Sequence, residues 1–287
     1  MKDRVYSSTK RDSTINATSN RVFTKADCMD WLDTLEDENI NLWICDVPYN
    51  VLTGNITNKN GASLFHSRYT AKVSPTESDF EKELVSSRFE IAIPWEEQRK
   101  LEDYKEWCYK WYCKAHKKLC DDSFMFIFWS MRYLNLAYQI FDVNRVIFWQ
   151  QPNMVSIISG DFSYDITPIL VIRKGNPRLN KEAKLWDKSS ILNFAKPQGN
   201  YKKDKLLHPT QKPQALLEHL VWLSDADHEG NVIGDFFAGS GSLLRAVNKA
   251  DVILCDMNQE YFDKFFDTYV TDPRVYKCKI IDDKKGR

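Results

Sequence analysis

Short apolar runs alternate with longer amphipathic stretches over most of the chain. The apolar runs have strand length and predict strands at residues 42–46, 123–129, 146–150, 166–173, 231–235 and 252–256. The stretches between them carry apolar residues at helical spacing and predict helices at residues 27–35, 98–119, 130–141, 215–223 and 243–249. This alternation indicates an α/β fold, in which a mostly parallel sheet is covered by helices on both faces.

Three regions depart from the alternation. Residues 1–20 are rich in Ser, Thr, Asn and charge and are predicted to form a mobile N-terminal tail. Residues 51–95 show little periodicity, and loops of this length are uncommon unless they are functional or disordered. We interpret them as a loop that covers the substrate. Residues 176–207 are polar and basic with few apolar anchors, which predicts a small basic insert.

The run before residue 46 ends in a polar tetrad, Asp46-Val47-Pro48-Tyr49. Four apolar residues stopped by Asp and Pro predict a buried parallel strand with polar groups at its carboxyl end. Open α/β sheets bind their ligands at that edge. The tetrad alone also fits an ordinary turn, so the rest of the chain decides between the two interpretations.

A glycine-containing loop follows the strand that ends at Asp235. Gly239 and Gly241 allow the backbone to turn tightly and to approach a ligand without a Cβ in the way. Asp256 ends the next strand, at about the 20-residue spacing at which a carboxylate binds ribose hydroxyls. These positions predict a nucleotide-type cofactor beside the loop.

Charge is balanced over the whole chain but unevenly distributed. Lys and Arg total 40, as do Asp and Glu, so no global excess indicates a nucleic-acid partner. Residues 26–58 contain seven acids and no Lys or Arg, whereas residues 173–205 contain ten basic residues and three acids. The second segment predicts a cationic face, and a solvated lysine-rich loop is the alternative.

Seven cysteines are scattered without a C-x-x-C pair. Cys45 and Cys255 lie in apolar runs, as buried free thiols do. The odd number, together with a charged N-terminus, predicts a reducing interior and a cytoplasmic, DNA-associated protein. No run approaches the ~20 apolar residues of a membrane span. No cluster of metal ligands is apparent, and we expect no metal.

Three motifs occur together in a fixed order. Residues 46–49 resemble the D-P-P-Y signature of amino-methyltransferases, with Val47 in place of the first proline. Residues 208–213 match H-P-T-Q-K-P, and residues 235–242 resemble D-P-F-x-G-S-G-T. This order resembles the circularly permuted β group of S-adenosylmethionine-dependent DNA amino-methyltransferases. The resemblance implies a Rossmann-like methyltransferase fold with a catalytic half and a cofactor half, residues 21–175 and 208–287.

The resemblance also implies the roles of individual residues. The catalytic residues would be Asp46, Val47, Pro48 and Tyr49. The cofactor would contact Asp27, Cys28, His208, Thr210, Lys212, Pro213, Asp235, Phe237, Gly239, Ser240, Gly241, Ser242 and Asp256. Asp46 and the carbonyl of Val47 would accept hydrogen bonds from the target amine, and Tyr49 would stack on a flipped base. Asp27 also fits an ordinary helix N-cap.

The implied substrate is double-stranded DNA with one base flipped out. Asp46 favours adenine N6, because the cytosine enzymes of the family tend to carry Ser there. Cytosine N4, RNA as the substrate, and a weakly active partner subunit remain as alternatives. A Rossmann-type redox enzyme is a further alternative, but it leaves the tetrad unexplained. The basic insert 176–207 is a candidate target-recognition segment, a homodimer is allowed, and restriction-modification is the implied setting.

Overall fold

The protein is represented by a computed structural model that describes residues 19–48, 101–153, 165–197 and 211–282, together with the backbone of 56–57 and 63–64. Residues 1–18 of the predicted tail, most of the loop 51–95 and the end of the insert therefore lie outside the described residues. Among the described residues, no helix has the length and apolar character needed to cross a membrane.

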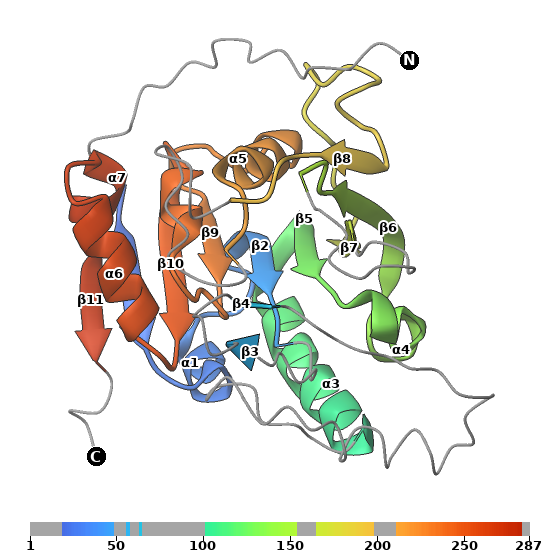
Figure 1. Ribbon diagram of the computed structural model, residues 1–287, viewed down its shortest axis with the longest axis horizontal. Helices are drawn as coiled ribbons and strands as arrows, with labels where there is room; N and C mark the ends of the chain where they lie inside the picture. The colour runs from blue at the N-terminus through green and yellow to red at the C-terminus, as the bar shows by residue number, and fades with distance from the viewer. Residues whose placement is uncertain are drawn as a thin grey trace.

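The described residues form a nine-stranded sheet in the order β11-β1-β10-β9-β2-β5-β7-β6-β8 (Figure 1). Its strands are β1 Arg21–Lys25, β2 Ile40–Asp46, β5 Leu119–Phe128, β6 Val143–Gln150, β7 Ile166–Lys174, β8 Ile191–Asn193, β9 Val232–Asp235, β10 Asp251–Asp256 and β11 Lys279–Asp282. A separate antiparallel pair consists of β3 Ile56–Thr57 and β4 Ser63–Leu64. The helices are α1 Cys28–Thr34, α3 Leu101–Lys118, α4 Leu134–Ile140, α5 Gln214–Leu223, α6 Glu260–Thr268 and α7 Pro273–Tyr276, with single 3-10 turns at η1 Met131–Tyr133 and η2 Ser242–Arg245.

The predicted mostly parallel sheet is confirmed. Among the nine described strands of this sheet, only β7 pairs in the antiparallel sense, and it does so with both β5 and β6. Two reversals restore the direction, so β6 and its parallel neighbour β8 run the same way as β2 and β5. The carboxyl ends of β1, β10, β9, β2, β5, β6 and β8 therefore share one edge, which we call the carboxyl edge. The opposite side is the amino edge.

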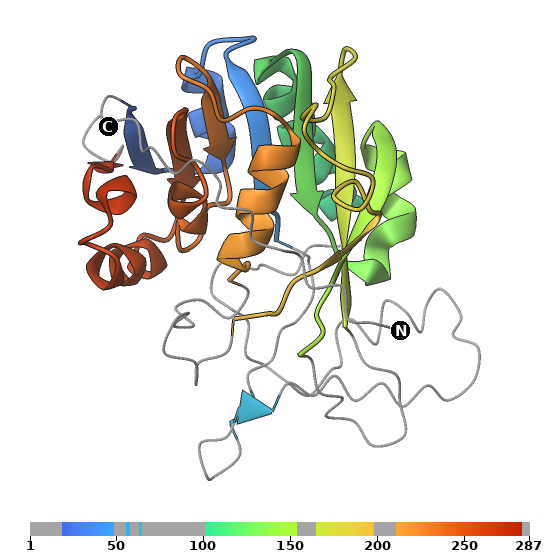
Figure 2. The ribbon, with the colours of Figure 1, turned by 90° about the horizontal axis from the view of Figure 1, so that it is seen from above.

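Helices cover both faces of the sheet, as predicted. In Figure 1, α1, α3 and α4 lie below the strands and α5 lies above them. The alternation of side chains along β2 explains this layering, because Leu42 and Ile44 join the apolar core on the α5 side, whereas Trp43 and Cys45 join the core under α3. Figure 2 shows β2, β5 and β7 side by side, with α5 packed along them. Each core is a contiguous cluster of buried apolar side chains, and together they support the sheet from both faces.

The predicted helix at 243–249 is wrong. Only the 3-10 turn η2 forms there, because side chains from other elements take the backbone groups that a helix would pair internally. The buried guanidinium of Arg21 donates to the carbonyls of Leu244 and Val247, each at 3.0 Å. The carboxylate of Asp227 accepts hydrogen bonds from the N–H groups of residues 248–250. Long-range hydrogen bonds therefore replace the local ones that the apolar spacing favours.

The described part of the basic insert extends the sheet. β8 forms its edge strand, with Leu192 fully buried in the core. The insert begins at the amino edge, where the N–H of Asn180 donates to the carbonyl of Leu223 at the end of α5. It reaches the carboxyl edge only after β8, at residues 194–197.

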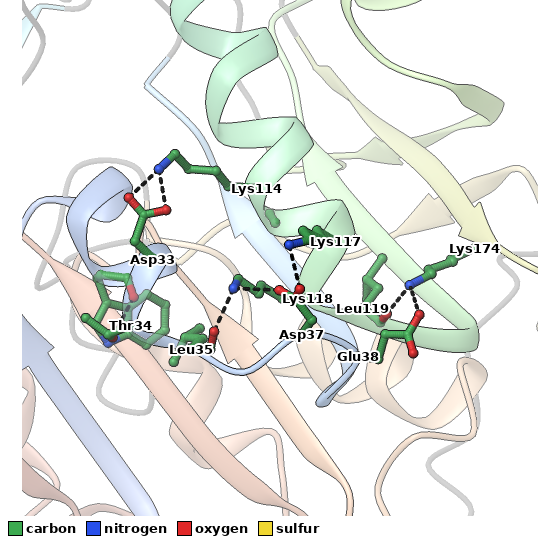
Figure 3. A network of polar contacts seen from close by, with 12 residues as sticks. Asp33, Thr34, Leu35, Asp37, Glu38, Lys114, Lys117, Lys118, Leu119 and Lys174 are labelled. Atoms are coloured by element: carbon green, nitrogen blue, oxygen red, sulfur yellow. Dashed lines mark hydrogen bonds and ion pairs between the residues drawn. The ribbon is translucent and has the colours of Figure 1, made fainter.

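Three acids of the run 26–58 are paired at the amino edge with lysines that are distant in sequence (Figure 3). The pairs are Asp33 with Lys114, Asp37 with Lys117 and Lys118, and Glu38 with Lys174. Two of these lysines also donate to main-chain carbonyls, Lys118 to Leu35 at 2.6 Å and Lys174 to Leu119 at 2.7 Å. The run is therefore part of a structural network that joins α1 and β2 to the end of α3.

Candidate active site

Four predicted carboxylates meet at the carboxyl edge. Asp46, Asp235 and Asp256 end β2, β9 and β10, three strands that are neighbours in the sheet. Asp27 follows β1, the next strand, and the N–H of Ala26 donates to the carbonyl of Asp256 at 3.2 Å. Residues far apart in the chain come together because parallel strands of similar length end at one edge.

Asp46 lies at the centre of this edge and is paired with Lys212. The ammonium of Lys212 donates to Oδ2 of Asp46. The side chains are 8% and 21% exposed, respectively, so the pair is largely withdrawn from water. The ammonium also lies 4.9 Å from the centre of the Phe128 ring. Phe128 ends β5 directly beside Asp46 in the sheet register, so β2 and β5 together fix this contact.

The turn after Asp46 is held by buried groups. Val47 is 2% exposed and packs in the core under α3. The hydroxyl of Tyr104 donates to the carbonyl of Pro48 at 2.8 Å, and its ring stacks on Trp129 with centroids 6.0 Å apart. Burial of Val47 therefore supplies restraint where the family motif has a proline. Tyr49, predicted to stack on the base, lies outside the described residues.

The loop after β9 is tied to Asp256. Oδ1 of Asp235 accepts the N–H of Phe237 at 2.9 Å, and Oδ2 of Asp256 accepts the N–H of Gly239 at 2.7 Å. The hydroxyls of Ser240 and Ser242 lie 2.9 Å apart. The predicted loop residues are thus brought together, and the backbone of the loop is fixed to the end of the neighbouring strand.

Gly241 serves packing as well as the turn. Its φ of +78° lies in the left-handed region that favours glycine. A Cβ there would lie 2.8 Å from the ring of Phe262, which is fully buried on the inner side of the loop. Gly241 therefore lets the loop close onto α6.

Burial raises the pKa of the acids at this edge. Asp256 has a raised pKa because its carboxylate is desolvated, although the N–H groups of Asn258 and Gly239 oppose the shift. Burial raises the pKa of Asp235 to about 8, helped by the charges of Asp46 and Asp256 and opposed by its bond to Phe237. Asp235 is therefore largely protonated at neutral pH. Such perturbed carboxyls are typical of functional sites and cost stability.

Asp27 and Cys28 begin α1. Oδ1 of Asp27 accepts the N–H of Met29 at 2.8 Å, so Asp27 is the N-cap that the alternative interpretation predicted. The thiol of Cys28 is 5% exposed, and burial, together with the nearby Asp27 and Asp256, raises its pKa. Cys28 is therefore a neutral thiol beside the Asp256 carboxylate.

The H-P-T-Q-K-P motif at residues 208–213, which we call the hexad, is only partly described. His208 and Thr210 lie outside the described residues. Lys212 contacts Asp46, and Pro213 is the N-cap of α5, with its carbonyl accepting hydrogen bonds from Leu216 at 3.1 Å and Leu217 at 3.2 Å. The structure thus brings Lys212 to Asp46 of the tetrad.

Sequence reasoning missed Lys196. Its N–H donates to Oδ1 of Asn153, and Nδ2 of Asn153 donates back to its carbonyl, both at 2.8 Å. Burial lowers the pKa of Lys196, the charge of Lys212 lowers it further, and Asp46 opposes them. Lys196 therefore lies within electrostatic reach of Asp46. Its only signal in the sequence was the basic character of the insert.

Within the described ranges, no group of three or more His, Cys, Asp or Glu side chains is arranged to hold a metal ion. The seven cysteines are free thiols, with Cys45 and Cys255 fully buried as predicted.

Comparison with solved structures shows the same fold. M1.HpyAVI superposes with a TM-score of 0.54 at 19% identity, covering 86% of this chain and 96% of that one. The PvuII DNA methyltransferase, which is cytosine-N4-specific, superposes with a TM-score of 0.60 at 15% identity, covering 92% of this chain and 95% of that one.

Comparison of sequences also finds Type II methyltransferases among the relatives of this chain. The Type II methyltransferase M.HpaI of Haemophilus parainfluenzae is 25% identical over 191 residues, which are 56% of this chain and 57% of that protein. The Type II methyltransferase M2.DpnII of Streptococcus pneumoniae is 24% identical over 235 residues, 77% of this chain and 78% of that one. A family model for N6/N4 methyltransferases, described as DNA methylase, matches residues 40–267, from the start of β2 into α6. The chain therefore belongs to the DNA methylase family of N6/N4 amino-methyltransferases.

Proposed function

We propose that this protein methylates the N6 amine of adenine in DNA, with S-adenosylmethionine as the methyl donor. The observation that carries the proposal is the position of Asp46. Its carboxylate ends a central strand, next to the glycine loop and Asp256 at one edge of the sheet. An acceptor for the target amine and the candidate cofactor loop therefore lie on neighbouring strands.

S-adenosylmethionine is the cofactor, and it supplies an electrophilic methyl group on a cationic sulfur. The residues at the carboxyl edge fit such a molecule. Each oxygen of Asp256 accepts one backbone N–H, from Gly239 and from Asn258. A carboxylate has about four lone-pair sites, so Asp256 can accept ribose hydroxyls as well.

The chemistry assigned to the tetrad follows from the target amine. The lone pair of an exocyclic amine is delocalised into the base, which makes the amine a poor nucleophile. Acceptors on its two N–H bonds favour a tetrahedral nitrogen whose lone pair points at the methyl group. We assign one acceptor to Asp46 and the other to the carbonyl of Val47. The bond from Tyr104 to Pro48 and the burial of Val47 hold this turn in place, which supports catalysis by positioning.

The target base must leave the duplex to reach this edge. Extrusion costs a few kcal/mol, which stacking on an aromatic side chain partly offsets. We assign that stacking to Tyr49, which directly follows the tightly held turn. Double-stranded DNA is therefore the proposed substrate.

The basic insert 176–207 is the proposed DNA contact. The part that supports this role best is its carboxyl end, because Lys196 lies near Lys212 and Asp46. The earlier lysines of the insert lie toward the amino edge, where Asn180 contacts the end of α5. We therefore expect residues after β8 to contact the target nucleotide more than residues before it.

Cytosine N4 is the second candidate. The superposition with the cytosine-N4-specific PvuII enzyme favours it, because the amine chemistry of the two bases is the same. Asp46 favours adenine, since the cytosine enzymes of the family tend to carry Ser at this position.

Sequencing of modified bases in DNA from cells expressing the protein tests the proposal, with cells expressing Asp46→Ala as the control. The expected result is N6-methyladenine at one short recurrent sequence, absent from the control. N4-methylcytosine at a recurrent sequence would show that the target is cytosine N4, the second candidate, and not adenine N6. Methylated adenine in RNA but not in DNA would overturn the assignment of DNA as the substrate.

A further inference from the structure

We propose that Lys212 is a positioning residue that orients the Asp46 carboxylate, in place of the cofactor contact that the hexad implies. This inference rests on the proposed function, because it assigns Asp46 as the acceptor of the target amine. Its basis is the contact between Lys212 and Asp46, which join two motifs separated by 166 residues.

The backbone of Lys212 is fixed. The residue directly precedes Pro213, the N-cap of α5, and α5 packs into the core through Leu216 and Leu220, both fully buried. Ordering a lysine side chain costs rotamer entropy, and a backbone that is already fixed adds no further entropy cost to the contact. Here the helix start sets the direction from which the side chain approaches the carboxyl edge.

The ammonium of Lys212 is held by two groups at once. It donates to Oδ2 of Asp46, and it lies 4.9 Å from the centre of the Phe128 ring, a side chain that is 1% exposed. A cation near an aromatic face is attracted to it, more strongly when water is excluded. Because Phe128 and Asp46 are register partners on adjacent strands, the ammonium lies across the β2–β5 junction.

This arrangement distinguishes the two oxygens of Asp46. A carboxylate on a free rotor would present either oxygen to the target amine in many orientations. With Oδ2 held by Lys212, the plane of the carboxylate is set and Oδ1 is directed by the same contact. The contact of Lys212 with Oδ2 and with the Phe128 ring is the geometry that carries this assignment.

The test is a double-mutant cycle. Lys212→Met and Lys212→Arg are made in the wild-type and Asp46→Ala backgrounds. Turnover is measured at saturating S-adenosylmethionine, and the Kd for the cofactor is measured by calorimetry. We expect Lys212→Met to lower kcat by about 10²-fold, the scale of a misplaced catalytic group. The Kd should change less than about twofold, and Lys212→Arg should recover most of the loss. In the Asp46→Ala background, Lys212→Met should cost nothing more.

Lys174→Met is the matched control. The side chain of Lys174 is 17% exposed and lies at the amino edge. Its ammonium pairs with the Glu38 carboxylate and also donates to the carbonyl of Leu119. Lys174→Met should leave kcat unchanged. Thermal unfolding of every variant reports folding, and Lys212→Gln takes the place of Lys212→Met in the cycle if Lys212→Met does not fold.

Two outcomes would overturn the inference. A weakened cofactor Kd with unchanged kcat at saturation would make Lys212 a cofactor contact. Equal losses in both backgrounds would show that Lys212 does not act through Asp46. The methylated product of the wild-type protein tests the proposed function, and this test is independent of the cycle. If that product is N4-methylcytosine, the adenine assignment falls, while the cycle still decides the role of Lys212 on that amine.

Discussion

The two edges of the sheet use the same residue types in opposite ways. At the amino edge, the acids of the ion pairs are exposed to solvent. In the pair of Asp37 and Lys117, the side chains are 41% and 70% exposed. At the carboxyl edge, the pair of Asp46 and Lys212 is largely buried. Its neighbours Asp235 and Asp256 are bonded to backbone N–H groups.

The pKa shifts show what this difference means. Hydrogen bonds from Lys117 and Lys118 lower the pKa of Asp37, so folding favours its charged form. Burial raises the pKa of Asp235 and Asp256, so folding disfavours theirs. Exposed pairs are screened by solvent and contribute little to stability, whereas buried carboxyls cost stability. The carboxyl edge thus retains groups that folding alone does not favour, which is expected of a site that binds ligands.

The largest effect should come from Asp46. Asp46→Ala removes the acceptor and should lower turnover by ~10²-fold or more, on the scale of one lost transition-state contact. Asp46→Asn keeps one acceptor oxygen and should lose less. Cofactor affinity should be normal in both variants. The assay is methyl transfer to DNA at saturating cofactor. Full activity of the Asp46→Ala variant would show that the carboxyl edge is no more important for catalysis than the amino edge.

The next effect concerns the cofactor. Asp256→Ala removes a carboxylate suited to ribose hydroxyls and releases the N–H of Gly239, so binding of S-adenosylmethionine should weaken by ~1–3 kcal/mol. Calorimetric titration measures this change, with Asp37→Ala as the control from the amino edge. Equal affinities of the Asp256 variant and the wild type would place the ribose elsewhere.

Asp235 should make stability depend on pH. Its folded pKa of about 8 lies far above the value of an unfolded Asp. Between these two values the folded protein retains a proton that the unfolded chain has lost. The stability contributed by this proton is fully present below the unfolded pKa and is lost as pH rises toward 8.

Asp235→Asn should therefore flatten the decline in unfolding free energy between pH 5 and 7, by up to about 1 kcal/mol per pH unit. Urea unfolding at several pH values measures the difference between variant and wild type. Parallel profiles would mean that Asp235 is ionised in the folded protein.

The smallest effect should come from the amino edge. Asp37→Ala removes the partner of Lys117 and Lys118, but the ammonium of Lys118 keeps its bond to the carbonyl of Leu35. Tm should change by no more than about 2 °C, and turnover should stay at the wild-type level. A loss of turnover here would show that the network of Figure 3 supports catalysis.

The strands and their ends were predictable because they depend on local pattern. The apolar runs before Asp46, Asp235 and Asp256 predicted buried strands, and strands that run in parallel must end at one edge. The same reasoning placed helices on both faces. It failed at η2, where Arg21 and Asp227 satisfy backbone groups from a distance.

The pairing of charges was not predictable. Nothing local to Asp33 and Glu38 indicates that they pair with Lys114 and Lys174, because these contacts depend on how α3 and β7 pack. The contact of Lys212 with Asp46 and the approach of Lys196 likewise follow from sheet order and the start of α5. Side-chain partners across the fold are set by tertiary geometry, whereas strand ends are set by the chain itself.

One measurement tests the central claim that the carboxyl edge is the active site of an adenine methyltransferase. DNA is incubated with the protein and S-adenosylmethionine labelled in its methyl group, then digested to nucleosides and separated. We predict that the label co-migrates with N6-methyl-2′-deoxyadenosine. The Asp46→Ala variant should incorporate at most about a hundredth as much label as the wild type. Label in N4-methylcytosine would contradict the choice of base, and equal incorporation by Asp46→Ala would contradict the site.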